Sequence, residues 1–246
     1  MSDRSILYTV MYAKRLTEAL PEVRERIAAA AARRGGGPVT LVAVTKGHPL
    51  AAVEAARAAG IGDVGENRVQ ELVAKRAELE AANPDAAGSL RWHLIGHLQR
   101  NKVRRALGAF ELIHSLDSER LARELSAEAT RAGVTVRALA EVNVSGEATK
   151  GGFDGAAALE PLGRVCVLPG LRVEGLMTMA PFTAAEPVLR ATFQAVRGLL
   201  EECVREVPGF GGRELSMGMS NDYEIAIEEG ATMVRLGTVL FGERVQ

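Results

Sequence analysis

The stretch Val39-Thr-Leu-Val-Ala-Val44 is a continuous run of apolar and β-branched residues. A short apolar run of this kind predicts a buried β-strand. Lys46 follows at its C-terminal end, and a helical pattern begins three residues later at Pro49. A strand followed by a helix is the repeating unit of α/β folds, so the number of further copies decides the architecture.

The same strand pattern occurs at eight places in the chain. The expected strands are residues 39–45, 61–65, 91–95, 112–115, 137–144, 172–177, 214–217 and 233–236. Stretches with helical spacing alternate with them, at 14–33, 49–59, 68–82, 98–108, 118–132, 155–167, 186–207 and 222–229. Two further segments, Asn83-Pro84-Asp85 and residues 207–212, are expected to be loops because they are rich in turn residues.

Regular alternation of strands and helices predicts a parallel sheet, because parallel neighbours need crossover connections. Eight units predict an α/β fold consisting of a single closed (β/α)8 TIM barrel, preceded by one extra N-terminal helix. An open doubly wound sheet is the alternative. No expected strand is followed by the G-x-G-x-x-G turn of dinucleotide-binding sheets, and Gly35-Gly-Gly37 precedes a strand instead of following one.

The composition fits one globular domain. The chain has 246 residues, of which 47% are hydrophobic, and its net charge of -1 gives no electrostatic case for a nucleic-acid or membrane partner. Residues 11–246 are expected to form the barrel, and residues 1–10 an N-terminal extension that can be disordered, with Met11 as an alternative start. The two cysteines show no metal-ligand spacing, so no metal site is assigned and a reducing cytoplasm is expected.

Lys46 is the residue with the most distinctive chemistry. Burial at the end of a strand disfavours the ammonium form of lysine and lowers its pKa. The neutral amine attacks aldehydes, so such a lysine suits Schiff-base chemistry. The alternative is a structural lysine whose stem covers apolar surface while its amine reaches water.

The ends of the last two expected strands have the composition of a phosphate site. Barrels often bind phosphate at the loops after strands seven and eight. Gly237 allows close approach of the backbone, and Thr238 and Ser216 add hydroxyl donors. The alternative is that Gly237 is only a turn residue and Thr238 only a helix N-cap.

A Schiff-base lysine and a phosphate site in one barrel mouth fit two ligands. One is a phosphosugar, as in Schiff-base aldolases, and the other is pyridoxal 5′-phosphate (PLP). Arg235 favours PLP, because it shares a strand face with Gly237 and can donate to the pyridine nitrogen. The alternative for Arg235 is a salt-bridged barrel residue.

Five motifs occur in one order along the chain. They are Ala43-Val-Thr-Lys46, Gly65-Glu-Asn-Arg68, Trp92-His-Leu-Ile-Gly-His-Leu-Gln99 with Asn101-Lys102, Leu215-Ser-Met-Gly-Met-Ser220 and Met233-Val-Arg-Leu-Gly-Thr238. Together they closely resemble the YggS/PROSC family of pyridoxal phosphate homeostasis proteins, over roughly residues 11 to 242.

The resemblance implies a barrel like the N-terminal domain of alanine racemases, with PLP held as an aldimine on Lys46. It also implies roles for six other residues. The phosphate is expected at Ser216, Gly237 and Thr238, the pyridine nitrogen at Arg235, and the ring pocket beside Asn67 and His93. Without the resemblance, His93 fits equally well as a core histidine with satisfied hydrogen bonds. Asn67 fits equally well as a residue that caps a loop.

The resemblance further implies a role in intracellular vitamin B6 homeostasis, in which the protein buffers PLP or delivers it to apo-PLP enzymes. No catalytic residue is assigned. The chain ends soon after the eighth expected strand, which predicts that the C-terminal domain supplying the tyrosine base of alanine racemases is absent, and a monomer is expected. The alternatives are a weak PLP-dependent amino-acid racemase and a PLP-free aldolase.

Overall fold

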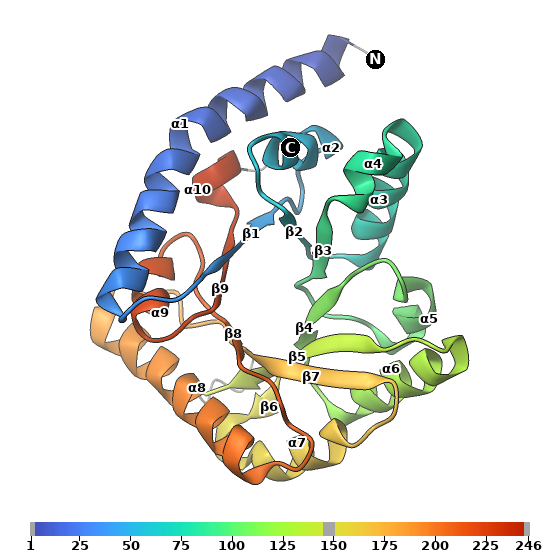
Figure 1. The fold of residues 1–246 in the computed structure, drawn as a ribbon, viewed down its shortest axis with the longest axis vertical. Coiled ribbons are helices and arrows are strands. Elements are labelled where there is room, and N and C mark those ends of the chain that lie inside the picture. The colour runs from blue at the N-terminus through green and yellow to red at the C-terminus, as the bar shows by residue number, and fades with distance from the viewer. Residues whose placement is uncertain (1–2, 145–150, 244–246) are drawn as a thin grey trace.

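The computed structural model describes residues 3–144 and 151–243 and shows a closed barrel of eight strands inside a ring of helices (Figure 1). The barrel strands are β1 (Thr40–Val44), β2 (Asp63–Glu66), β3 (Arg91–Leu94), β4 (Leu112–Leu116), β5 (Val136–Asn143), β7 (Leu171–Met177), β8 (Glu214–Ser216) and β9 (Met233–Leu236). Each pairing between the described strands is parallel, and the pairings β1–β9 and β4–β5 close the ring. The expected (β/α)8 barrel is therefore confirmed.

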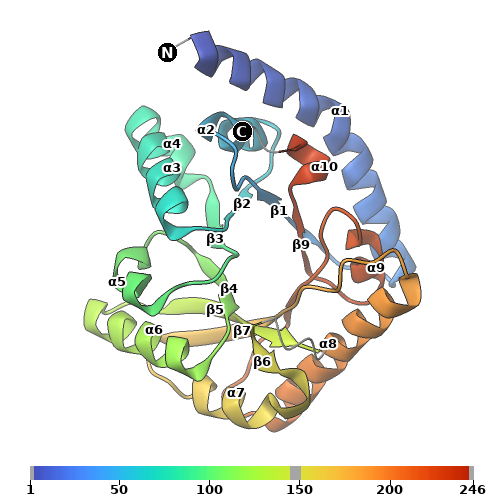
Figure 2. The ribbon, with the colours of Figure 1, turned by 180° about the vertical axis from the view of Figure 1, so that it is seen from behind.

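A further two-residue strand, β6 (Phe153–Asp154), pairs with β5 beside the barrel. The helical elements are α1 (Asp3–Arg33), α2 (Leu50–Ala58), α3 (Val69–Ala82), α4 (Pro84–Gly88), η1 (Arg100–Lys102), α5 (Val103–Ala106), α6 (Glu119–Ala132), η2 (Gly155–Ala157), α7 (Leu159–Cys166), α8 (Glu186–Glu206), α9 (Tyr223–Glu228) and α10 (Thr238–Phe241). Figure 2, the view from behind, shows the same outer ring of helices.

Helix α1 crosses the seam at which the barrel closes. Its apolar positions Leu16, Leu20 and Val23 are buried, as their three- and four-residue spacing predicts. The helix packs on α2, α9 and α10, so it covers elements from both ends of the chain. Pro21 lies inside it and removes one backbone hydrogen bond, and the helix curves around the barrel (Figure 1).

The structure differs from the sequence-based expectations at four places. Helix α1 begins at Asp3 and not at Lys14, since no glycine or proline interrupts the chain between them. Residues 83–85, expected as a loop, start the short helix α4, because the Asn83 side chain accepts a hydrogen bond from the Ala86 N–H at 3.0 Å. Strand β6 was not expected, because an element of two residues has no periodicity to read. Helix α10 has Gly237 at its N-cap and starts at Thr238, whereas the alternative for Thr238 made that residue the N-cap.

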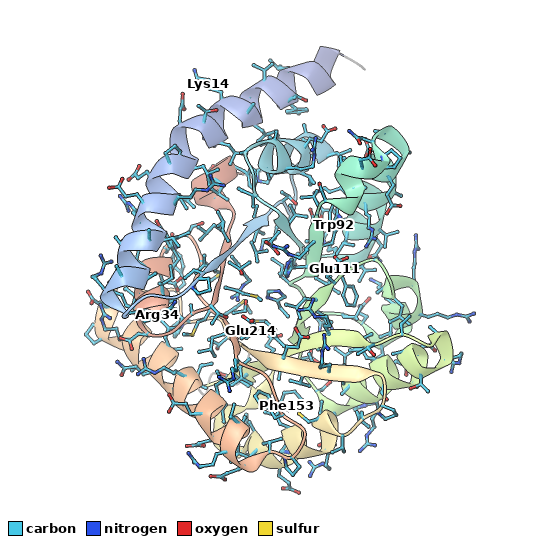
Figure 3. The ribbon with its side chains drawn as sticks, viewed as in Figure 1. Lys14, Arg34, Trp92, Glu111, Phe153 and Glu214 are labelled. Carbon is cyan, nitrogen blue, oxygen red and sulfur yellow. The ribbon has the colours of Figure 1, made fainter. Side chains whose placement is uncertain are left out.

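The barrel interior has an apolar and a polar part. Leu112, Leu139, Met177 and Met233 form a small apolar cluster separate from the main core between strands and helices. The buried polar residues include Asp63, His93, His114, Ser216 and Arg235. Side chains from the strands fill the inside of the ring (Figure 3).

Candidate cofactor-binding site

Lys46 lies in a tight turn directly after β1. The His48 N–H donates to the Thr45 carbonyl at 3.0 Å, which closes a β-turn around Lys46 and Gly47. Gly47 has φ 75°, the left-handed conformation that the third position of a type II turn requires. The half-buried Lys46 side chain therefore starts from a backbone of fixed geometry at the C-terminal end of the barrel.

A buried ion-pair group, which we call the anchor cluster, consists of Glu66, Glu71 and Lys75. The Lys75 ammonium lies 2.7 Å from Glu66 Oε1 and 2.9 Å from Glu71 Oε1. Glu66 is fully buried, and only 9% of the Lys75 side chain is exposed. Buried charges are tolerated when they are paired in this way.

The anchor cluster holds the backbone on both sides of Lys46. Lys75 Nζ donates to the Thr45 carbonyl at 2.8 Å, and Thr45 Oγ1 donates to a Glu66 oxygen at 2.5 Å. On the other side, the Gly47 N–H donates to Glu71 Oε1 at 2.8 Å. These bonds fix the direction in which Lys46 leaves β1.

Glu66 has an unusual electrostatic position. Burial raises the pKa of its carboxyl above the ordinary value, and attraction to Lys75 opposes that rise. Its second oxygen, Oε2, is buried and has no hydrogen-bond partner. The lysine therefore provides the main stabilisation of the carboxylate form.

The end of β9 lies next to the end of β1. The two strands pair with Ala43 opposite Leu236, so Gly237 comes beside Val44. A Cβ on Gly237 would lie 3.2 Å from the Val44 carbonyl oxygen, which is tighter than ordinary packing. The candidate phosphate loop and the Lys46 turn are thus on adjacent strands at the same barrel mouth.

Helix α10 starts at Thr238, directly after Gly237. Ser220 reaches this helix from the loop after β8, where its Oγ accepts the Val239 N–H at 3.3 Å. Hydroxyls and first-turn amides in one place are the donors that a phosphate group needs. Sequence reasoning did not assign Ser220, although it lies in the quoted 215–220 motif.

Ser216 and Arg235, from the ends of β8 and β9, are hydrogen-bonded to each other. Arg235 is 5% exposed, and its Nη1 donates to the Ser216 carbonyl at 2.7 Å and to Ser216 Oγ at 2.5 Å. Arg235 Nη2 donates to the Thr178 carbonyl at 2.9 Å. The Ser216 hydroxyl therefore has two hydrogen-bond partners inside the barrel, Arg235 and His114, and its role at the phosphate stays a prediction.

Arg235 remains a cation at neutral pH. Burial lowers its pKa to about 10, while the charges of Asp222 and Glu141 act in the opposite direction. A guanidinium has five N–H donors and no acceptor, and the three bonds above use three of them. It can therefore offer a hydrogen bond to a ring nitrogen but cannot take a proton from one.

The two remaining predicted ring-pocket residues differ in their surroundings. His93 is 3% exposed and hydrogen-bonded on both nitrogens, to His114 at 2.8 Å and to Asp63 at 3.0 Å. Its alternative reading as a satisfied core histidine describes these contacts. Asn67 is exposed and packs against Gly96, whose Cβ would lie 2.3 Å from the Asn67 carbonyl oxygen.

The mouth therefore combines Lys46, Gly237, Thr238 and Asn67 on neighbouring elements, with Arg235 behind them on β9. These groups fit PLP, which needs an amine for its aldehyde, donors for its phosphate and a partner for its ring nitrogen. Within residues 3–144 and 151–243, no group of three or more His, Cys, Asp or Glu residues could hold a metal ion. No helix in this described part is long and apolar enough to span a membrane.

Comparison with known proteins gives consistent matches over most of the chain. The family model of the alanine racemase N-terminal domain matches residues 19–245. The pyridoxal phosphate homeostasis protein of Aquifex aeolicus is 42% identical over 229 residues, covering 92% of this chain and 97% of the relative. That of Pseudomonas aeruginosa is 41% identical over 231 residues, covering 93% and 96%.

Solved structures agree with these matches. PipY of Synechococcus elongatus PCC7942 with PLP bound has a TM-score of 0.76 and 41% identity, covering 88% of this chain and 100% of PipY. Alanine racemase of Clostridium difficile 630 has a TM-score of 0.66 at 14% identity, and the match covers 90% of this chain and 60% of the racemase. At this identity the similarity shows the fold alone.

The fold and the barrel mouth define a protein of the alanine racemase N-terminal-domain class. Within this class, the identity to the homeostasis proteins extends over nearly the whole length of both chains. The chain belongs to the family of pyridoxal phosphate homeostasis proteins, so the expectation from the sequence motifs is confirmed.

Proposed function

We propose that this protein binds PLP covalently through Lys46 and acts in vitamin B6 homeostasis, buffering the cofactor or handing it to apo-PLP enzymes. The observation that carries the proposal is the placement of Lys46 and the phosphate loop on the adjacent strands β1 and β9. The relatives named as homeostasis proteins and the PLP-bound PipY support it.

In the proposed complex the phosphate is held by the α10 amides, Thr238 and Ser220, with Gly237 allowing close approach. Arg235 faces the ring nitrogen, and Asn67 borders the ring. The bound cofactor supplies an electron-withdrawing ring. Because Arg235 cannot accept a proton, it keeps the ring nitrogen unprotonated and so weakens that withdrawal.

Weak electron withdrawal argues against transaminase-like chemistry, which uses the ring as an electron sink. The three tyrosines of the chain are the candidates for the second acid/base group that racemisation needs. Tyr12 is buried, and its hydroxyl is hydrogen-bonded to His48 Nδ1 at 2.9 Å. Burial raises the pKa of both Tyr12 and Tyr223. Tyr8 stacks on Tyr12 in α1. A missing acid/base group lowers the rate by roughly 10²–10⁴-fold. We therefore propose a carrier without strong turnover. We also propose that it acts in the cytoplasm as a monomer.

The test is the visible spectrum of the purified protein with added PLP, followed by borohydride reduction and peptide mass mapping. We expect a yellow protein with the reduced cofactor on the Lys46 peptide and no band in Lys46→Ala. Lys14→Ala is the matched control, because the Lys14 side chain is 77% exposed and points away from the barrel (Figure 3). A wild type that stays colourless refutes the proposal.

The racemase alternative has its own measurement. Incubation of the PLP-loaded protein with alanine in deuterated water is followed by proton NMR of the α-position. We expect no exchange beyond that given by free PLP. Fast exchange that is lost in Lys46→Ala would replace the carrier by an enzyme.

A further inference from the structure

A continuous chain of buried hydrogen bonds crosses the barrel. It runs from Arg235 to Ser216 at 2.5 Å, to His114 at 2.8 Å, to His93 at 2.8 Å and to Asp63 at 3.0 Å. We call these five residues the interior chain. Strands β4 and β8, which carry His114 and Ser216, are not neighbours in the sheet, so their bond spans the inside of the barrel.

The direction of each bond follows from counting donors and acceptors. Arg235 has only donors, so Ser216 Oγ accepts from it. The serine hydrogen is then available for His114 Nδ1. A neutral His114 that accepts at Nδ1 carries its hydrogen on Nε2, which faces His93 Nδ1. His93 in turn carries its hydrogen on Nε2 and donates it to the Asp63 carboxylate.

The opposite direction is less favourable. It requires His114 to donate to Ser216, and His93 must then donate at both nitrogens and carry a positive charge. Complete burial first, and then His93 and Arg235, hold the pKa of His114 well below its usual value, so this ring is neutral in both directions. The cost of the opposite direction is instead a buried positive charge on His93 and a Ser216 hydroxyl hydrogen that has no acceptor in the chain. The first direction gives every hydrogen of the chain an acceptor, as buried polar groups require.

The chain links the buried cation Arg235 to a carboxylate at the opposite end of the barrel. The oxygens that accept from the Arg235 guanidinium among the described residues are two carbonyls and one hydroxyl. Asp63 lies at the start of β2, and hydrogen bonds to His93 and Arg91 lower its pKa against the effect of burial. It is therefore an anion that polarises the chain from its far end.

We propose that Asp63, His93 and His114 are positioning residues for the cofactor, acting through Ser216 to hold Arg235 in its orientation toward the ring nitrogen. This inference rests on the proposed function. Asp63 thereby controls, from the N-terminal end of the barrel, how firmly the guanidinium is held. Asp63 and Arg91 line a pocket of about 470 Å³ at that end, so the far end of the chain lies near solvent.

The two ends of the chain are tested with separate substitutions. Asp63→Asn keeps the shape and removes the charge, and Ser216→Ala breaks the link to Arg235. Glu174→Gln is the matched control, because Glu174 on β7 also pairs with an arginine, Arg137, but is not part of the chain. A single hydrogen bond changes an equilibrium by about 2- to 10-fold.

The first readout needs no cofactor. Nitrogen-15 NMR of the four imidazoles should show His93 and His114 each as the Nε2–H tautomer in the wild type and in Glu174→Gln. In Ser216→Ala, His114 should lose its hydrogen-bonded Nδ1 signal. A His114 that carries its hydrogen on Nδ1 in the wild type overturns the inference, whatever the protein binds.

The second readout uses the PLP-loaded protein. We expect Asp63→Asn and Ser216→Ala to release PLP about 3- to 10-fold faster, and Glu174→Gln to release it at the wild-type rate. Release from Asp63→Asn at the wild-type rate overturns the coupling, and Asp63→Asn alone decides this if Ser216→Ala does not fold. A wild type that never takes up PLP refutes the proposed function instead, while the NMR readout still tests the chain.

Discussion

Replacing Lys75 by methionine should destabilise the protein strongly and in a pH-dependent way. The change keeps most of the apolar stem but removes the ammonium that contacts Glu66, Glu71 and the Thr45 carbonyl. Glu66 is fully buried, so the value for breaking a buried pair applies, about 3–5 kcal/mol, and not the 0–1 kcal/mol of surface pairs. We expect a loss of about 3 kcal/mol at pH 7.5, because proton uptake by Glu66 limits the penalty.

The pH dependence has a definite sign. The pKa of Glu66 is already raised in the folded protein, and removing Lys75 raises it further. A group with a raised folded-state pKa favours the folded state at low pH and loses that effect as the pH rises through the folded-state pKa. The destabilisation by Lys75→Met should therefore shrink toward acid pH, by at most about 1.4 kcal/mol per pH unit.

The assay is thermal or urea unfolding at pH 5.5 and pH 8. A loss of 3 kcal/mol corresponds to a melting temperature lower by about 6–12 °C in a protein of this size. Glu66→Gln with Lys75→Met should recover part of the loss, with a coupling energy of about 1–3 kcal/mol. The assignment of a buried ion pair between Lys75 and Glu66 is refuted if the two substitutions have additive effects on stability, or if the loss of stability does not depend on pH. Lys14→Met, at an exposed pair, should change stability by less than about 0.5 kcal/mol.

Three further predictions concern the phosphate loop, the thiols and the close contact between β7 and β8. Ser220→Ala should release PLP about 3- to 10-fold faster than the wild type. The control is Ser126→Ala, which should release PLP at the wild-type rate because the Ser126 hydroxyl donates to the Pro169 carbonyl away from the mouth. A stopped-flow transfer assay compares the two rates. Burial raises the pKa of Cys166 to about 11 and of Cys203 to about 12, which lowers the fraction of reactive thiolate at pH 8. Both thiols should therefore react with a thiol reagent at pH 8 at least about 100-fold slower in the folded protein than in the urea-unfolded protein. Gly175→Ala should give little folded protein by circular dichroism, because its Cβ would lie 1.9 Å from a carbonyl oxygen of β8; a normal spectrum and melting temperature would contradict this.

The barrel could be predicted from sequence because its signal repeats. All eight barrel strands lie within two residues of their expected bounds, since each is a short, mostly buried segment between helical patterns. The short elements could not be predicted in the same way. Helix α4 depends on one Asn83 cap, and β6 on two residues that gain their partners only when β5 is in place.

The site was predictable where it depends on strand ends and not where it depends on side-chain partners. Lys46 and Gly237 follow their strands directly, so barrel geometry places them together. Ser220 was missed because β8 ends at Ser216, one residue before its expected end, and the loop then carries Ser220 to α10. The bond from Ser216 to His114 joins residues 102 apart in sequence, and no local pattern indicates it.

Helix α1 also sets an order of events during synthesis. Its partners include α9, through the ion pairs of Arg33 with Glu228 and Arg26 with Glu224, and α10, where Tyr12 packs on Phe241. About 190 residues separate the end of α1 from α9, which a ribosome needs roughly 10–40 s to add. Until then the apolar face of the first helix has no final partner on that side. Of the three helices α2, α9 and α10 that pack on α1, the nascent chain therefore offers α2 alone until α9 and α10 have been added.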